Sequence, residues 1–215
     1  MQADPLVRVL PVDRLDPVSH LRLDAELLGD LPAEGLIESF AGVGLAAGEF
    51  PEPSQVLAQV NDILCEENDS GIFVTVFYGV IDHQAATLTY ANGGHNPPYL
   101  TRAGRDVTAL ETTGGIALGV VSGLEYLQQT VDLCPEDTLF FYTDGITEAF
   151  DPAGNIYSDL RLKEVLYESR DLSVEALGRS VIGNVESFAN GAPQSDDITC
   201  VVARYRAVTD KAQAA

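Results

Sequence analysis

Residues 72–91 read IFVTVFYGVIDHQAATLTYA, and this stretch decides between the two main classes of mixed fold. Ile72–Ile81 is β-branched, aromatic and almost continuously apolar, which is typical of a strand that is covered on both faces. Asp82–Ala85 turns the chain, and Ala86–Ala91 returns as the neighbouring strand. The stretch therefore predicts a β-hairpin, that is, two antiparallel neighbours and not one strand of a parallel sheet.

The segments around this hairpin fit the same class of fold. Helical spacing of apolar residues predicts helices over Leu36–Ala47, Ser54–Cys65, Leu160–Ser169 and Ser173–Ala189. Further strands are expected over His20–Leu28, Tyr99–Arg102, Tyr126–Leu133, Thr138–Tyr142 and Ile198–Tyr205. Helices thus come in pairs between hairpin-linked strands, which predicts an antiparallel α+β layered fold. No GxGxxG follows a strand, so a dinucleotide-binding fold is not expected.

The composition excludes several classes of partner. The chain has 215 residues, which suits one domain, and 12 Lys and Arg stand against 33 Asp and Glu, a formal charge of −21. Such a surface repels phosphate backbones and anionic lipid headgroups, so neither nucleic acid nor membrane is an expected partner. No apolar run approaches the ~20 residues that span a bilayer, and Met1–Arg8 does not read as a signal peptide. A cytoplasmic location is expected.

The three cysteines, Cys65, Cys134 and Cys200, lie far apart and show no metal-ligand spacing. Their number is odd, which does not suggest a disulfide framework. We expect all three to be buried free thiols in a reducing compartment.

Aspartates stand next to apolar strands at three places: Gly29–Asp30, Thr143–Gly145 and Asp196–Asp197. A carboxylate at a strand end is held by the sheet while it points past it, so several strand ends can aim oxygens at one point. Hard cations such as Mg²⁺ and Mn²⁺ prefer these ligands, and a pair of such ions can activate water and clamp a phosphoryl group. However, Asp-Gly is also common turn chemistry and an Asp pair can simply cap a strand. The turns alone leave both interpretations open.

The order and the residues of five segments decide between a metal site and plain turns. They are GIFVTVFYGVID (71–82), TYANGGHNPPYL (89–100), TGGIALG (113–119), TDGITEA (143–149) and QSDDIT (194–199). Together they resemble the SpoIIE/RsbU-like branch of the metal-dependent (PPM, type 2C) serine/threonine protein phosphatases. The resemblance covers roughly residues 29–206.

This resemblance implies a four-layer αββα sandwich of two antiparallel sheets flanked by helix pairs. Residues 1–207 would form the phosphatase domain and 208–215 a polar tail. It implies hydrolysis of phosphoserine or phosphothreonine by a metal-activated water, with no protein nucleophile. Two Mn²⁺ or Mg²⁺ ions would be held by Asp30, Asp144 and Asp196, while Asp197 and Gly145 would orient the site.

The resemblance also implies partners. The substrate would be a phosphorylated anti-sigma-factor antagonist in a partner-switching pathway, and an attached sensor domain or a homodimer stays open. His95 either polarises the substrate or braces the NGGHNPP loop, and the structural role is favoured. The aromatic residues Phe73, Phe77 and Tyr90 are expected in the core.

The N-terminal third departs from the family pattern. The family's GDVSGKG reads GDLPAEG at Gly29–Gly35, and the upstream GDxxD motif and the strand before it are not recognisable. Only Asp4 lies near the expected position, and Arg8 stands where a second carboxylate is expected. Losing a ligand would weaken one metal, so the alternative is a pseudo-phosphatase that binds a partner without turnover. A third hypothesis, an unrelated acidic α/β domain, requires the segment matches to be chance.

Overall fold

The computed structural model describes residues 52–66, 68, 71–102 and 106–206, together with the backbone of 6–9 and 18–21. The helix expected at Leu36–Ala47 and the Gly29–Asp30 turn lie outside these residues. The chain divides into two compact units. The first unit comprises residues 1–14, 98–110 and 134–215, and the second comprises 15–97 and 111–133.

The first unit is built on a five-stranded sheet in the order β1-β9-β8-β5-β6. Its strands are β1 (Leu6–Val9), β5 (Tyr99–Thr101), β6 (Val107–Ala109), β8 (Thr138–Tyr142) and β9 (Thr199–Arg204). Neighbouring strands are antiparallel except for β1 and β9, which run parallel. The central strand β8 is buried along its whole length.

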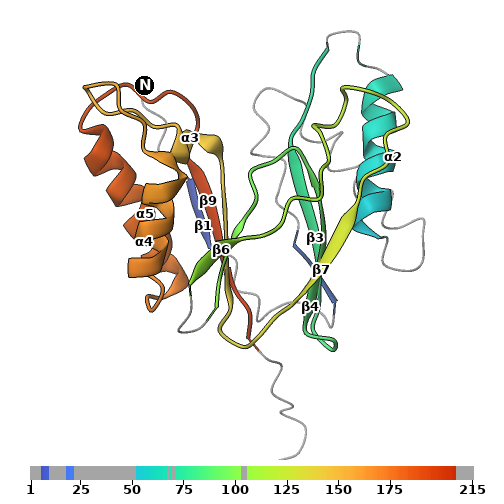
Figure 1. Cartoon of the computed structure of the whole chain (residues 1–215), viewed down its shortest axis with the longest axis horizontal. Helices are drawn as coiled ribbons and strands as arrows, with labels where there is room; N and C mark the ends of the chain where they lie inside the picture. Colours follow the sequence, from blue (N-terminus) through green and yellow to red (C-terminus); the bar gives the residue numbers. More distant parts are fainter. Residues whose placement is uncertain are drawn as a thin grey trace, which may run out of the picture. The chain divides into compact units, whose positions relative to one another are not determined.

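Helices α4 (Ser158–Glu168) and α5 (Val174–Ala189) pack on one face of this sheet, and the short α3 (Asp144–Thr147) follows β8 (Figure 1). The stripe that helical spacing predicts on α5 is confirmed, because Leu177, Val181 and Val185 are buried against the sheet. The helix begins after Ser173, whose hydroxyl accepts a hydrogen bond from the amide of Ala176 at 3.2 Å.

The second unit is a four-stranded sheet in the order β2-β3-β4-β7, with every neighbouring pair antiparallel. Its elements are α2 (Pro53–Glu66), β2 (Val18–Leu21), β3 (Val76–Asp82), β4 (Thr87–Gly93) and β7 (Gln128–Asp132). Helix α2 buries Val56, Leu57 and Val60 in the core of this unit. The predicted hairpin is confirmed as β3 and β4, and Asp82 fixes its turn by accepting from the amides of Gln84 and Ala85.

The predicted α+β class with two antiparallel sheets is confirmed, with the parallel β1–β9 pair as an addition. β1 and β6 were not predicted, because so few residues carry little periodicity and neither stretch stands in a recognisable motif, unlike the equally short β5. None of the helices in the described part of the chain has the length and apolar character needed to cross a bilayer.

Two burial predictions need correction. Phe77 and Tyr90 lie in the core, but Phe73 is 63% exposed. Val74 pairs with Leu118 and is buried, and successive residues of an extended chain point to opposite sides, so Phe73 faces out. For the same reason β3 alternates between buried and half-buried positions and is not covered equally on both faces.

The cysteines also differ from the expectation of three buried thiols. Cys200 is buried in β9, where burial raises the pKa of its thiol to about 12. Cys65 is only partly buried, and Cys134 is exposed because it belongs to the turn that precedes β8. All three are free thiols, as expected.

Candidate metal centre

The pairing of β8 with β9 brings two of the three acidic turns together. The two strands are antiparallel, and Tyr142 at the end of β8 lies opposite Cys200 at the start of β9. The chain leaving β8 and the chain entering β9 therefore emerge at the same edge of the sheet. Asp144 follows one strand and Asp196–Asp197 precede the other, so both turns lie at this edge.

Thr143 fastens the two turns to each other. Its hydroxyl donates to the carbonyl oxygen of Asp197 at 2.7 Å and accepts from the amide of Thr199 at 3.0 Å. Its own amide donates to the carbonyl oxygen of Thr199 at 3.1 Å. The β8–β9 ladder thus continues one residue past β8, up to the first aspartate.

Gly145 permits the close approach of the two turns. A Cβ atom at this position would overlap the carbonyl oxygen of Asp197 and lie 3.0 Å from that of Asp196. The residue is buried in the first turn of α3. Any larger residue at this position would push the aspartate turns apart. The orienting role of Gly145 at a metal site stays a prediction.

Further hydrogen bonds order the loop before β9. The side-chain amide of Gln194 donates to the carbonyl oxygen of Asp196 at 2.7 Å, and the hydroxyl of Ser195 donates to that of Glu148 at 3.2 Å. The amide of Asp197 donates to Oδ1 of Asp196 at 2.7 Å. This acidic loop is therefore tied both to itself and to the chain after α3.

The three carboxylates Asp144, Asp196 and Asp197 are exposed. None of them belongs to the ion pairs seen between described residues, which are Arg102–Asp137 and Arg170–Asp171. Carboxylates without a protein cation attract divalent cations, and exposure leaves room for the waters that Mg²⁺ and Mn²⁺ retain. Their oxygens are thus donors of the kind that such an ion prefers.

The third predicted ligand, Asp30, lies outside the described residues. Within the described part, no group of three or more His, Cys, Asp or Glu side chains is placed to hold a metal. The contacts described above therefore place the turn of Asp144 next to the turn of Asp196 and Asp197. The assignment of metal ligands stays a prediction.

Two tyrosines anchor the end of β8, the strand that leads to Asp144. The hydroxyls of Tyr142 and Tyr99 donate to Oδ1 of Asp159 in α4, at 3.0 and 3.4 Å. Burial, followed by the negative charge of Asp159, raises the pKa of both phenols, so both remain donors at neutral pH. The end of β8 is thereby fixed to the helix layer just before the acidic turn begins.

A pocket of about 340 Å³ adjoins the acidic turns. Its lining includes Gly145 and Ser195 from the turns, together with Ile182, Val185 and Ala189 of α5. Sequence reasoning missed this pocket and the Thr143 fastening, because both depend on contacts between segments far apart in the chain. In the sequence, only the apolar side of α5 next to the QSDDIT segment could have indicated the pocket.

His95 lies in a different loop, within the second unit. There the side chain of Asn92 braces the loop by accepting from the amide of His95 and donating to its carbonyl oxygen, each at 2.8 Å. The imidazole Nδ1 lies 3.2 Å from the hydroxyl of Thr75. The amide of Asn92 thus braces the loop through the backbone of residue 95, and the role of the His95 side chain stays a prediction.

The fold matches solved phosphatase domains of the PP2C class. The SiaA-PP2C domain of Pseudomonas aeruginosa superposes with a TM-score of 0.68 at 18% identity, covering 87% of this chain and 74% of that chain. The PP2C phosphatase domain and regulatory fragment of SpoIIE from Bacillus subtilis give a TM-score of 0.63 at 20% identity, over 79% and 48% of the two chains. The architecture is therefore that of a PP2C phosphatase domain.

The sequence places the chain within that class. The family model described as Stage II sporulation protein E (SpoIIE) matches residues 31–206, and the chain belongs to this family, in the SpoIIE/RsbU-like branch of the PPM phosphatases.

Two curated relatives agree with this placement. Protein IcfG of Synechocystis is 31% identical over 147 residues, which is 67% of this chain and 22% of that protein. Phosphoserine phosphatase RsbU of Bacillus subtilis is 26% identical over 155 residues, or 72% of this chain and 45% of RsbU. The chain thus matches less than half the length of either relative.

Proposed function

We propose that this chain is a metal-dependent protein phosphatase that hydrolyses phosphoserine or phosphothreonine on a regulatory protein. One observation carries the proposal: the carboxylates of Asp144 and Asp196 stand on turns fastened together at one sheet edge, in none of the ion pairs of the described residues. Membership of the SpoIIE family and similarity to phosphoserine phosphatase RsbU support it.

In this proposal Asp144 and Asp196 hold Mn²⁺ or Mg²⁺, and Asp30 is the third carboxylate. Two ions are expected. Because the N-terminal motif is divergent, the ion that depends on it should bind more weakly than the other. Bound ions of this kind neutralise a phosphoryl group and lower the pKa of water. The chain's own contribution is geometric: Thr143 and Gly145 set the distance between the turns, and Asp197 orients the neighbouring carboxylate.

For the substrate we propose a phosphorylated anti-sigma-factor antagonist in a cytoplasmic partner-switching pathway. The resemblance to the SpoIIE/RsbU-like branch supports this choice, and the formal charge of −21 argues against a nucleic acid. The pocket beside the acidic turns offers space for a side chain next to the phosphorylated residue.

The test is Mn²⁺-dependent release of phosphate from a phosphoserine peptide by the full chain and by Asp144→Asn. We expect kcat/KM to fall at least ~100-fold, because outer partners of metal sites alone are worth 10–100-fold. The matched control is Asp171→Asn, which removes an exposed carboxylate from a surface ion pair and should leave the rate unchanged. Equally negligible rates for the unchanged protein and Asp144→Asn would reject the enzyme.

The pseudo-phosphatase is the second candidate, and the eroded GDLPAEG segment favours it. It predicts that calorimetry with millimolar Mn²⁺ gives little or no heat of binding. Two tightly bound ions, both lost or weakened in Asp144→Asn, would exclude this candidate and support the enzyme.

A further inference from the structure

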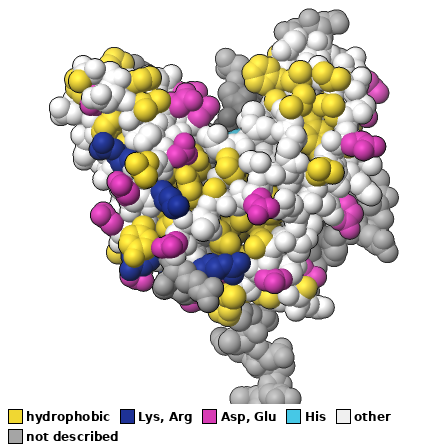
Figure 2. Space-filling view, in the orientation of Figure 1, with side chains coloured by type: hydrophobic (Ala, Val, Ile, Leu, Met, Phe, Trp, Pro, Cys, Tyr) yellow, Lys and Arg dark blue, Asp and Glu magenta, His cyan; other side chains and the backbone are white. Residues whose placement is uncertain are grey.

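Exposed apolar side chains gather at one end of the second unit. These side chains are well exposed: Phe73 is 63%, Val120 52% and Val121 50% exposed. The bridge between Val74 and Leu118 places the chain before β3 alongside the 116–121 segment. We call the resulting patch the apolar surface; it consists of Ile72, Phe73, Ile116, Val120 and Val121 (Figure 2, upper right).

Buried amides hold the backbone beneath the apolar surface. The side chain of Asn61 in α2, which is fully buried, accepts from the amide of Gly119 at 3.0 Å and donates to the carbonyl oxygen of Val121 at 2.9 Å. Asn68 donates to the carbonyl oxygens of Gly119 at 2.8 Å and Ile72 at 2.6 Å. Both segments of the surface are therefore attached to the same helix region.

Gly119 makes this attachment possible. Its φ of +86° is favourable only for glycine, and a Cβ there would lie 2.9 Å from the carbonyl oxygen of Ile72. The apolar side chains on either side are thus presented outward from a fixed backbone. A surface that is ordered in advance loses little conformational entropy when it binds.

The charge around the apolar surface has one sign. The sequence contains no Lys or Arg between Arg22 and Arg102, nor between Arg105 and Arg161, so the described part of the second unit contains none. Exposed carboxylates stand close to the surface in sequence: Glu66 lies two residues before Asn68, and Glu125 lies four residues after Val121. On the face shown in Figure 2, the Lys and Arg side chains accordingly lie over the first unit.

We propose that the apolar surface is the docking surface for a basic, apolar segment of a partner protein. Contiguous exposed apolar residues mark interaction sites in soluble proteins. The carboxylates around them attract Lys and Arg that flank an apolar anchor, which adds specificity and speeds association. A second copy of this chain fits less well, because two surfaces of the same negative sign repel each other.

The test uses a fluorescent peptide of Leu and Lys at helical spacing, with binding to the full chain measured by anisotropy at 0.15 M salt. A Leu and Glu peptide of the same pattern is the control ligand. We expect one site for the Leu and Lys peptide, and no binding of the Leu and Glu peptide. The double variant Phe73→Ser and Val120→Ser should weaken binding at least tenfold, because it removes two apolar contacts from the interface.

Matched variants separate this surface from general acidity. Leu160→Ser removes an apolar side chain that is 68% exposed on α4, and it should leave binding unchanged. The pair Glu66→Gln and Glu125→Gln should weaken binding several-fold, whereas Glu168→Gln on α4 should not. Because these positions are all exposed, urea unfolding should give unchanged midpoints, and the phosphatase rate on a phosphoserine peptide should also be unchanged.

Several results would overturn the proposal. Equal binding by the unchanged protein and by the double variant would do so, as would equal binding of the Leu and Glu peptide. A third such result could come from sedimentation equilibrium. If the chain self-associated and the double variant did not, the apolar surface would bind a second copy of this chain. None of these outcomes depends on whether the chain turns over phosphoserine, so the two proposals fail separately.

Discussion

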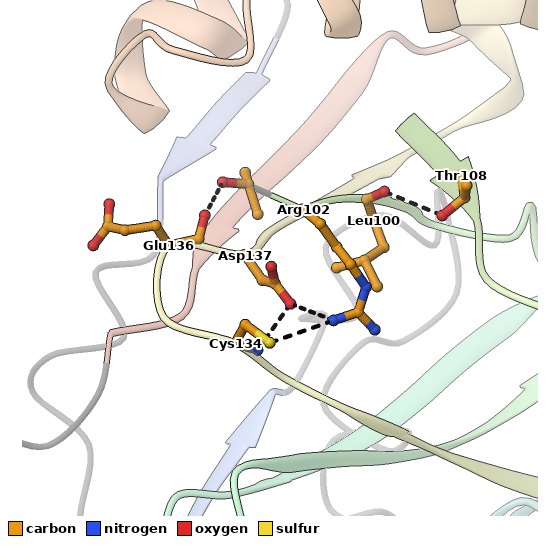
Figure 3. Close-up of polar contacts among 7 residues, drawn as sticks. Leu100, Arg102, Thr108, Cys134, Glu136 and Asp137 are labelled. Carbon is orange, nitrogen blue, oxygen red and sulfur yellow. Dashed lines mark hydrogen bonds and ion pairs between the residues drawn. The ribbon is translucent and has the colours of Figure 1, made fainter. Parts of the chain in front are cut away.

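An aspartate lies close to each end of strand β8, and one of the two is buried while the other is exposed. At the start, Asp137 is 1% exposed, and its Oδ2 lies 3.1 Å from the Arg102 guanidinium and 2.9 Å from the amide of Cys134 (Figure 3). At the end, Asp144 is exposed and takes part in none of the ion pairs between described residues. The first aspartate is held by the fold, and the second is available to bind a ligand.

Burial and pairing identify Asp137 as a structural carboxylate, and among the described residues neither applies to Asp144. Asp137 also accepts no hydrogen bond at Oδ1 within the described part of the chain, so its charge depends on Arg102. A buried carboxylate is costly unless a cation compensates it, whereas an exposed cluster retains its water and can exchange it for an ion. Burial and a protein cation therefore distinguish the two ends of one strand.

The largest effect on stability is expected at the buried end. Asp137→Ala removes the ion pair to the partly buried Arg102 and the hydrogen bond to the amide of Cys134. We expect a loss of roughly 2–4 kcal/mol in the free energy of unfolding, measured with urea. Asp144→Ala, the counterpart at the other end, should change stability by less than about 0.5 kcal/mol. Similar losses at both ends would contradict the comparison.

At the exposed end, a smaller effect should follow from Gly145→Ala. The new methyl group meets the carbonyl oxygen of Asp197 and separates the two acidic turns. We expect Mn²⁺ affinity, measured by calorimetry, to fall about tenfold, or about 1.4 kcal/mol. Gly183→Ala in α5 is the matched control, because its Cβ meets nothing within 4 Å. An unchanged affinity in Gly145→Ala would show that the spacing of the turns is not critical.

The fastening of the turns is expected to contribute less still. Thr143→Val removes the hydrogen bonds to Asp197 and Thr199 while it preserves the shape of the side chain. We expect a loss of about 1 kcal/mol in unfolding free energy, with partial recovery in Thr143→Ser. If serine recovered nothing, the hydroxyl would not be the fastening group.

The smallest effect is expected for a carboxylate that is paired but exposed. Asp171 is 83% exposed and lies 3.9 Å from Arg170. Its replacement by Asn should change the free energy of unfolding by less than about 0.5 kcal/mol, because solvent screens the pair. A loss as large as that of Asp137→Ala would show that burial is not what distinguishes the two pairs.

Much of this arrangement is predictable from sequence, for physical reasons. The bounds predicted for Thr138–Tyr142 are those of β8, and the stripe on α5 identifies its buried face, because periodicity records which side of an element meets the core. The motifs also indicate that the turns of Asp144 and Asp196 adjoin strand ends, and the structure shows that these two turns are in contact.

What escaped prediction depends on contacts between distant residues. Nothing near Asp137 in the sequence indicates that Arg102 compensates it, and an Asp-Gly turn does not show which backbone its glycine touches. Phe73 was misplaced because an apolar run does not reveal where pairing begins. The predicted single domain over 1–207 and the ligand role of Asp30 stay predictions.

The position of β9 between β1 and β8 has a consequence for biosynthesis. β9 is the last strand of the described chain, yet it completes the pairing of one strand near the N-terminus and of another in the middle. Because a chain is synthesised from its N-terminus, β1 and β8 cannot pair with β9 until β9 has been made. Contacts between residues so far apart in sequence also form slowly. A nascent chain that already bears Asp144 therefore still lacks the Asp196–Asp197 turn, and the two acidic turns can meet only once the last strand has emerged.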